Sequence, residues 1–377
     1  RSHAGLSEAF GYFNHLSVKT PFSWQVDNDA RDSSQYVVGI WQSGLGLADR
    51  DYYLKDTEKF AKIRADYQTY IAELLTLAGR DDAAAAAHRI VALETGIAKA
   101  HWSRVENRDP VKTYNKLSAA QMDELLGAMS WTSYAKAANL DKATEVVVGQ
   151  PTYLASLATL FSETSLQTWK DYLSYHLIND YAGSMNQELA DLHFNFFAKR
   201  LRGVEEQAPR WKRGIAAADA IVGEILGKFY VEKAFTPQAK ARMEVMVQNL
   251  MKAYSKRINQ LEWMSAATKK AAQEKLSKFI YKIGYPDSWK DYSSLQIKAD
   301  DLVGNGMRSS RWINDDMAAK LGQPIDRGIW HITPQTVNAY YNPVMNEIVF
   351  PAAILQPPFF NMAAEGAVNY GAIGAVI

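Results

Sequence analysis

The chain has 377 residues, with 42 Lys and Arg against 41 Asp and Glu, and it contains no cysteine. Its 47% hydrophobic content supports a large core and excludes general disorder. A net charge of +1 gives no overall field for nucleic acid or an anionic membrane, and no apolar run reaches the roughly 18 residues of a spanning helix. The absence of cysteine excludes disulfides, thiolate metal sites and cysteine catalysis.

The first half of the chain predicts helices and one short strand after a turn-rich start. Between Phe60 and Leu75, apolar residues recur every three or four positions, which is one face of an amphipathic helix. The alanine-rich segment 83–104 predicts a second helix. Ser118, with Gln three positions later, is a candidate capping box for a third. The apolar run Val146–Val148 predicts a strand.

Helical patterning continues from about 154 to 281, and another helix is predicted over 300–321. The pattern then changes, because 337–341 and 347–350 predict two extended segments joined by a turn, before a last helix over 365–377. We therefore predict a mainly α fold with a small β component. Its domains would be a mostly helical lobe over residues 1–285 and the beginning of an α+β lobe over residues 286–377.

The two ends of the sequence suggest a fragment. The chain opens without Met or a signal segment, and it closes on the apolar run Gly371–Ile377 with no polar cap. Because a terminus usually extends into solvent, we expect this apolar run to belong to a buried element that continues.

No metal-binding motif is evident. Among the seven histidines, no pair has the i, i+4 spacing that places two imidazoles on one helix face for zinc. For His88 and His101, which are thirteen positions apart on helical sequence, capping and partial burial are favoured over a metal site, whereas His331 could lie by a cleft near the extended segments. The histidines are His3, His15, His88, His101, His176, His193 and His331.

Other candidate sites have simpler interpretations. Gly223–Lys228 has three residues rather than four between its glycines, so it does not fit a phosphate-binding loop. The adjacent carboxylates Asp315 and Asp316 would diverge on a helix. A basic cluster favours a solvated helix end over a site for an anionic ligand; its members are Arg200, Arg202, Arg210, Lys212 and Arg213.

The stretch 337–360 is the most informative part of the sequence. It predicts a short edge strand beside an apolar loop that contains Pro351, Pro357 and Pro358. An exposed edge can receive an extended peptide by strand addition, and an Asn side chain can both donate to and accept from a peptide group. On composition alone, an ordinary hairpin that packs its aromatic residues into the core is favoured.

The same stretch closely resembles the neprilysin and endothelin-converting-enzyme family of zinc metallopeptidases, of the bacterial type. The resemblance rests on Asn338–Tyr341, on Ile348–Phe360 and on Asn369–Ile377, and upstream on 261–286 and 44–54. In that family the run ending here at Ile377 leads, through one Gly, into the H-E-x-x-H zinc helix. The sequence is therefore expected to stop just before the metal-binding motif.

The resemblance implies a zincin-like α+β catalytic lobe and a zinc-dependent endopeptidase that cleaves peptides or small proteins. In the family, two histidines and a distant glutamate bind zinc, and the Glu of the motif is the general base. All would lie beyond Ile377, so we expect no catalytic residue and no metal ligand in this chain. The chain alone should be inactive, and its partner would be the C-terminal remainder of the same enzyme.

The resemblance also implies a substrate-binding role for six residues. Asn338 and Ala339 would bond to the backbone of a peptide lying as an added strand. Tyr340 would line the pocket before the scissile bond. The apolar pocket after that bond would be lined by Ile354, Phe359 and Val376.

The alternative is a non-catalytic peptide-binding or scaffold protein that keeps the edge strand and has no metal. It predicts that the polypeptide ends at Ile377 and carries no zinc. Bacterial members of the family that this chain resembles are often exported, so the resemblance favours a periplasmic or extracellular location over the cytoplasm. The absence of cysteine is consistent with a disulfide-free bacterial relative.

Overall fold

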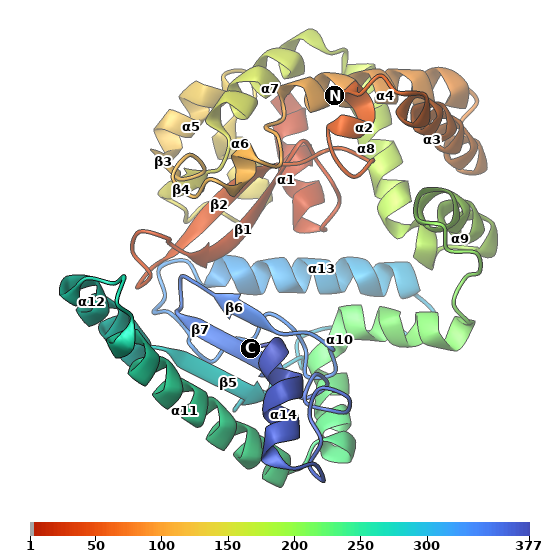
Figure 1. Cartoon of the computed structure of the whole chain (residues 1–377). Helices are drawn as coiled ribbons and strands as arrows, with labels where there is room; N and C mark the ends of the chain where they lie inside the picture. Colours follow the sequence, from red (N-terminus) through yellow and green to blue (C-terminus); the bar gives the residue numbers. More distant parts are fainter. Residues whose placement is uncertain (1–3) are drawn as a thin grey trace. The chain divides into compact units, whose positions relative to one another are not determined.

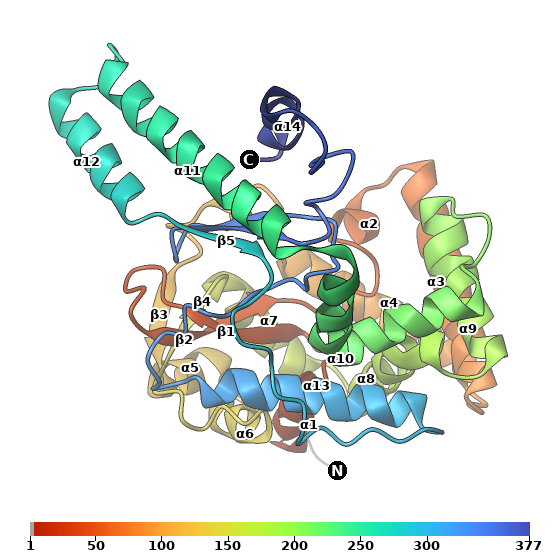
Figure 2. The same cartoon turned by 90° about the horizontal axis from the view of Figure 1, so that it is seen from below.

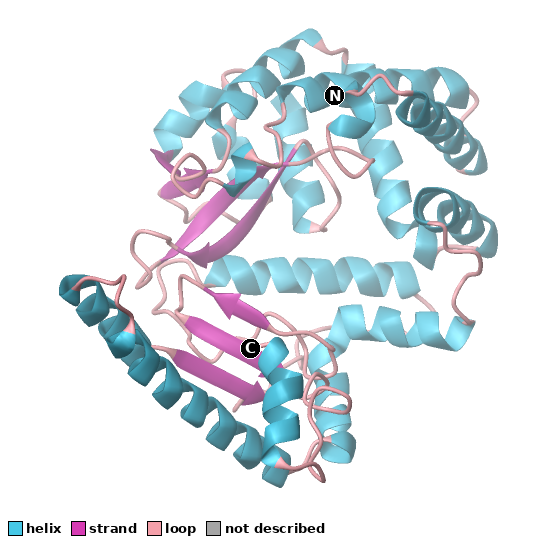
Figure 3. Ribbon diagram, viewed as in Figure 1, coloured by secondary structure: helices cyan, strands magenta, loops and turns pink. Residues whose placement is uncertain are grey.

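The computed structural model describes residues 4–377 and is mainly α-helical with two small sheets (Figures 1 and 3). Helices take 56% of the residues and strands 9%, which confirms the predicted fold class. Backbone contacts divide the chain into unit 1, residues 1–209 and 295–324, and unit 2, residues 210–294 and 325–377. The predicted domain boundary at residue 285 falls inside unit 2 by this division, and it stays a prediction. Within residues 4–377, every helix is too short or too polar to cross a membrane.

Unit 1 combines a helical array with a four-stranded sheet of order β1-β2-β4-β3. Its strands are β1 (Phe22–Asn28), β2 (Tyr36–Gln42), β3 (Asn115–Ser118) and β4 (Glu145–Val148). Its helices are α1 (Ala4–His15), α2 (Asp51–Leu54), α3 (Glu58–Leu77), α4 (Ala83–Ala100), α5 (Ala119–Leu126), α6 (Trp131–Ala137), α7 (Pro151–Glu163), α8 (Leu166–Tyr181), α9 (Gln187–Phe194) and α13 (Leu302–Ala319). A π-helical segment, Asn195–Arg200, continues α9.

Local signals place several of these elements as predicted. The Ser118 side chain accepts from the Gln121 N–H at 3.2 Å, and the Gln121 side chain accepts from the Ser118 N–H at 2.9 Å, so the capping box is confirmed. The hairpin of β1 and β2 was not predicted in the turn-rich first 55 residues. Its strands pair antiparallel from Phe22↔Gln42 to Asn28↔Tyr36.

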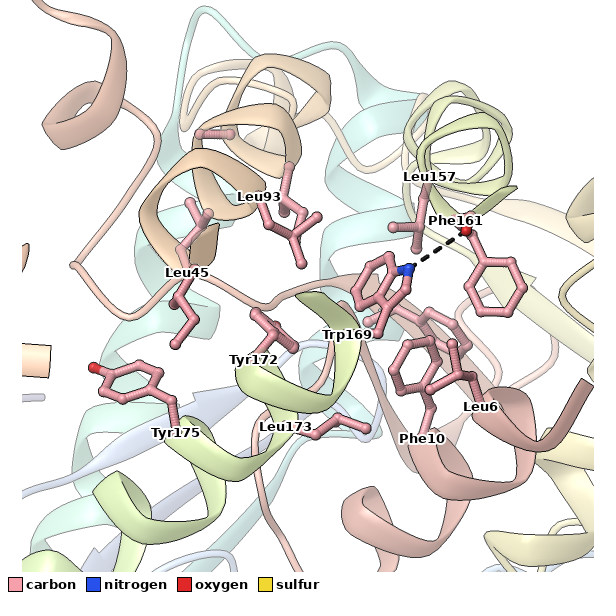
Figure 4. Packing of buried hydrophobic residues seen from close by; sticks show 14 of the residues in the cluster. Leu6, Phe10, Leu45, Leu93, Leu157, Phe161, Trp169, Tyr172, Leu173 and Tyr175 are labelled. Carbon is pink, nitrogen blue, oxygen red and sulfur yellow. Dashed lines mark hydrogen bonds between the residues drawn. The ribbon is translucent and has the colours of Figure 1, made fainter. Parts of the chain in front are cut away.

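Aromatic side chains fill the core of unit 1 (Figure 4). Phe10 and Trp169 are fully buried and meet edge to face, with ring centroids 5.3 Å apart. The indole N–H of Trp169 is directed to the Phe161 carbonyl at 3.4 Å, so its polar atom has a partner inside the core. Burial of such large side chains is the main source of stability for this unit.

A carboxylate, Glu94, lies at the centre of this core with no exposed surface. The hydroxyls of Tyr53 and Tyr67 donate to it at 2.6 and 2.9 Å, and the Nε2 atom of His176 lies 2.9 Å from its other oxygen. Burial, together with the Glu94 charge, raises the pKa of both tyrosines well above the ordinary value, so they remain protonated donors. This network joins α2, α3, α4 and α8.

Unit 2 contains the extended segments singled out in the sequence. Its helices are α10 (Arg210–Ala234), kinked at Val222, α11 (Pro237–Gln260), α12 (Ala266–Ser277) and α14 (Gly366–Ala372), which a 3₁₀ turn, Ile373–Ala375, continues. Its strands are β5 (Ile280–Gly284), β6 (Tyr340–Asn342) and β7 (Glu347–Pro351). Figure 2 shows α11 and α12 as a helical hairpin beside this sheet.

Two predicted boundaries in unit 2 are wrong. Helical patterning was predicted to reach residue 281, but β5 begins at Ile280, because pairing with β7 takes up its backbone groups. The last helix was predicted to run to Ile377, but its α-helical part ends at Ala372.

Replacing Glu94 with Ala should destabilise unit 1. The substitution leaves two buried hydroxyls and one imidazole without their partner, which typically costs about 3–5 kcal/mol. Glu163→Ala, at an exposed position of α7, should change stability by less than about 0.5 kcal/mol. Chemical denaturation followed by circular dichroism measures both, and a loss in Glu94→Ala no larger than that of the control would contradict the assigned role.

Candidate substrate-binding site

The sheet of unit 2 has the order β5-β7-β6, which leaves β6 at an edge. β7 pairs parallel with β5 from Ile280↔Glu347 to Gly284↔Pro351, and antiparallel with β6 from Tyr340↔Val349 to Asn342↔Glu347. Among the described residues no strand pairs with the outer side of β6. An edge of this kind offers backbone groups to an extended peptide.

The first two predicted site residues lie immediately before this edge strand. Asn338 is exposed, and its backbone N–H donates to the Thr336 carbonyl at 3.0 Å. Its Oδ1 atom accepts from the Ala339 N–H at 2.9 Å. This local bond orients the Asn338 side chain, and among residues 4–377 its Nδ2 group has no hydrogen-bond partner. Both donor hydrogens of that amide can therefore serve a bound peptide.

Tyr340, the third predicted residue, is the first residue of β6. Its hydroxyl accepts from the His331 N–H at 3.1 Å, and the two rings meet edge to face at 5.6 Å. Burial raises the pKa of Tyr340 to about 12, and the charge of Glu347 adds to the shift. The suggestion that His331 lies near the extended segments is thus confirmed; its role in a cleft stays a prediction.

The three residues predicted for the apolar pocket share one cluster in unit 2. Ile354 is a core member with 4% exposure, and Phe359 and Val376 pack against the same cluster. Ala339 also packs against it. The structure thus gathers all three around the core that supports the edge strand. Their contact with a substrate stays a prediction.

Two local constraints fix the ends of the chain segments around the predicted site, one at the end of β5 and one before α14. Gly284 has φ +85°, and its carbonyl accepts from the Ala352 N–H at 2.8 Å. A methyl group there would lie 2.5 Å from the Phe235 ring. Further along, the Asn369 side chain and the Asn361 backbone exchange two hydrogen bonds of 2.9 Å, which anchors α14 to the loop after β7.

The face of the sheet that α11 and α12 cover borders an open apolar pocket of about 440 Å³, which residues of the same apolar cluster line in part. Alternate strand residues reach it, since Tyr341, Ile348 and Phe350 form one side and α11 and α12 the other. Ile377 also lines it. A pocket of this volume falls in the range of about 300–1,000 Å³ that is typical of ligand sites, so another segment or a ligand can pack there.

Two charged residues of this sheet were not among the predicted site residues. Glu347 is fully buried, and Lys282 Nζ lies 2.9 Å from its Oε2 atom. For Glu347 the sequence carried a signal, because it is the one charge of the otherwise apolar predicted segment 347–350, and a buried charge needs a partner. Lys282 gave no such signal, because its strand was not predicted. The sequence could not show that the two strands are neighbours.

The described residues do not fit a zinc centre. No group of three or more His, Asp or Glu side chains within residues 4–377 is placed to hold a metal ion, and the chain has no Cys. His3 lies outside the described residues.

An edge strand before an apolar, proline-containing loop is a geometry to which an extended peptide can add. Comparison with known proteins assigns the family of the chain. The model of the N-terminal part of peptidase family M13 matches residues 1–286, and the model of the peptidase part matches residues 338–377. The chain belongs to peptidase family M13.

Individual relatives agree with this assignment. Human endothelin-converting enzyme 1 is 30% identical over 377 residues, covering 96% of this chain and 49% of that protein. The structure of the zinc metalloprotease Zmp1 of Mycobacterium tuberculosis has 42% identity and a TM-score of 0.94, covering 100% of this chain and 57% of that one. PepO of Lactobacillus rhamnosis shares the fold at 24% identity and a TM-score of 0.86. The chain thus spans about half the length of the curated relatives it matches.

Gly284→Ala should destabilise unit 2. Positive φ and the close Phe235 ring together should cost roughly 2 kcal/mol or more. The control is Gly214→Ala, inside α10 with nothing within 4 Å, which should be neutral or stabilise by up to about 1 kcal/mol. Thermal unfolding of both variants checks this, and equal midpoints would contradict the constraint at Gly284.

Proposed function

We propose that this chain is the substrate-binding part of a zinc-dependent endopeptidase that acts on peptides or small proteins, with the zinc ligands beyond Ile377. Membership of family M13 supports the peptidase activity. The observation that carries the role of this chain is the open edge of β6, with the Asn338 amide group beside it. A peptide added at this edge would be held through its backbone.

Asn338 and Ala339 would bond to the backbone of that peptide. Tyr340 would line the pocket before the scissile bond, and Ile354, Phe359 and Val376 the pocket after it. The exposure of Asn338 and the common apolar cluster of the other three support this division between polar edge and apolar wall. Chemistry would remain with the metal-binding segment, so the chain alone would be inactive.

The partner of this chain would be the C-terminal remainder of the same enzyme. Two observations support it: the chain covers 49% of human endothelin-converting enzyme 1, and Ile377 itself lines the apolar pocket between α11, α12 and the sheet. A following apolar segment could fill that pocket. We also propose an exported location, periplasmic or extracellular, on the resemblance to bacterial members of the family.

Zinc content tests this proposal against the non-catalytic alternative. The chain ending at Ile377 should hold no stoichiometric zinc, whereas the complete enzyme should hold about one zinc per molecule. Elemental analysis after gel filtration measures both, and denaturing intact-mass analysis shows whether a second polypeptide accompanies the 42.2 kDa species. A complete protein that has no zinc and cleaves no peptide would support the scaffold alternative.

Asn338→Ala in the complete enzyme should lower kcat/KM for peptide substrates by roughly tenfold, because one or two hydrogen bonds to the substrate are lost. Val337→Ala changes the neighbouring side chain, which is 64% exposed, and should leave kcat/KM unchanged. Steady-state kinetics on the same peptide compare the two variants. Wild-type kinetics for Asn338→Ala would remove this residue from the site.

A further inference from the structure

One face of the sheet in unit 2 carries charge beneath the edge strand. Cross-strand partners share a face, and the pairs Lys282↔Val349 and Val349↔Tyr340 place Lys282 and Tyr340 on the same side. Glu347 lies two residues before Val349 and so faces that side as well. This face is opposite to the one that borders the apolar pocket.

The contact between the two charges is buried and specific. Lys282 Nζ lies 2.9 Å from Glu347 Oε2, with side-chain exposures of 11% and 1%. Neither carboxylate oxygen of Glu347 has a hydrogen-bond partner among the described residues, so the ion pair with Lys282 is what compensates the buried charge. The pair joins β5 to β7, the strand on which β6 is aligned.

Lys282 also holds the loop that leads to the edge strand. Its Nζ atom donates to the Ile329 carbonyl at 2.8 Å. Two residues later the His331 N–H donates to the Tyr340 hydroxyl at 3.1 Å. The loop is therefore attached to β5 on one side and to β6 on the other, immediately before it reaches Asn338 and Ala339.

We propose that Lys282 and Glu347 are positioning residues, whose buried ion pair holds the loop 329–339 and the strand β6 in the geometry that receives a peptide. This inference rests on the proposed function of the edge strand. A buried ion pair contributes little net stability compared with apolar residues of the same volume, but it restricts the geometry of the groups that it joins. Loss of the pair should therefore affect substrate binding more than folding.

The test replaces both charges together, Lys282→Met with Glu347→Leu, because either substitution alone leaves an unpaired buried charge. In the 377-residue chain, the double variant should keep the thermal midpoint of the wild type within a few degrees. Amide hydrogen exchange over 329–342 should become about tenfold faster, since the loop loses its bond to Lys282. In the complete enzyme, kcat/KM for peptides should fall about tenfold, mainly through a higher KM.

The matched control is the exposed pair of Glu274 on α12 and Lys278, the residue that follows this helix, 2.8 Å apart, replaced by Gln and Met. Exposed pairs contribute little, so exchange over 329–342 and kinetics should stay at wild-type values. If the Lys282→Met/Glu347→Leu variant does not fold, Lys282→Met with Glu347→Gln keeps the side-chain volume at 347, leaves no buried charge, removes the bond to Ile329 and should show the same faster exchange.

The outcomes separate the two proposals. Wild-type exchange rates and kcat/KM within twofold of wild type in the folded variant would overturn the positioning role while leaving the peptidase intact. A wild-type complete protein that cleaves no peptide would overturn the proposed function, and hydrogen exchange would still decide whether the pair fixes the loop.

Discussion

The candidate site depends on the pairing of β7 with two strands that come from different parts of the chain. β5 ends at Gly284, more than fifty residues before the hairpin of β6 and β7, yet it provides the parallel neighbour that β7 needs. With β5 on one side, β7 can align β6 on the other and leave the outer side of β6 open. A parallel neighbour is brought in by a long connection, so the geometry of the edge is set by tertiary contacts.

Because side chains alternate along β7, one face of the sheet is apolar and the other carries the charged pair. Ile348 and Phe350 point to the apolar pocket, while Glu347 and Val349 face the side of Lys282 and Tyr340. A shift of one residue in the pairing would exchange these two sets. It would place Glu347 on the apolar side without its lysine, and the cost of a buried unpaired charge opposes such a shift. The charge thus helps to specify the register.

Much of this arrangement was predictable from the sequence, and the limits have physical reasons. Helices such as α3 and α5 carry periodicity and capping signals within their own residues, so they were predicted closely. β1, β2 and β5 were missed because strand formation depends on partners that local patterning does not contain. The six site residues came from family resemblance. Lys282 and Glu347 are 65 positions apart in the sequence, and only the structure shows that their side chains meet.

Glu94 and Glu347, two of the buried carboxylates among the described residues, are satisfied in different ways, and the difference matches their places. Glu94 has three hydrogen-bonding partners from three helices inside the core of unit 1, so its removal would disturb the centre of that core. Glu347 has one cation beside it and no hydrogen-bond partner for either oxygen among the described residues, and it lies on the strand that aligns an exposed edge. The Glu94 network joins four elements inside one core, so it bears mainly on the packing of that core. The Glu347 ion pair joins β7 to β5, so it bears mainly on the position of the strand that aligns the edge. A peptide bound through its backbone would depend on the position of the edge strand, because its hydrogen bonds form only where the backbone groups of that strand are correctly placed.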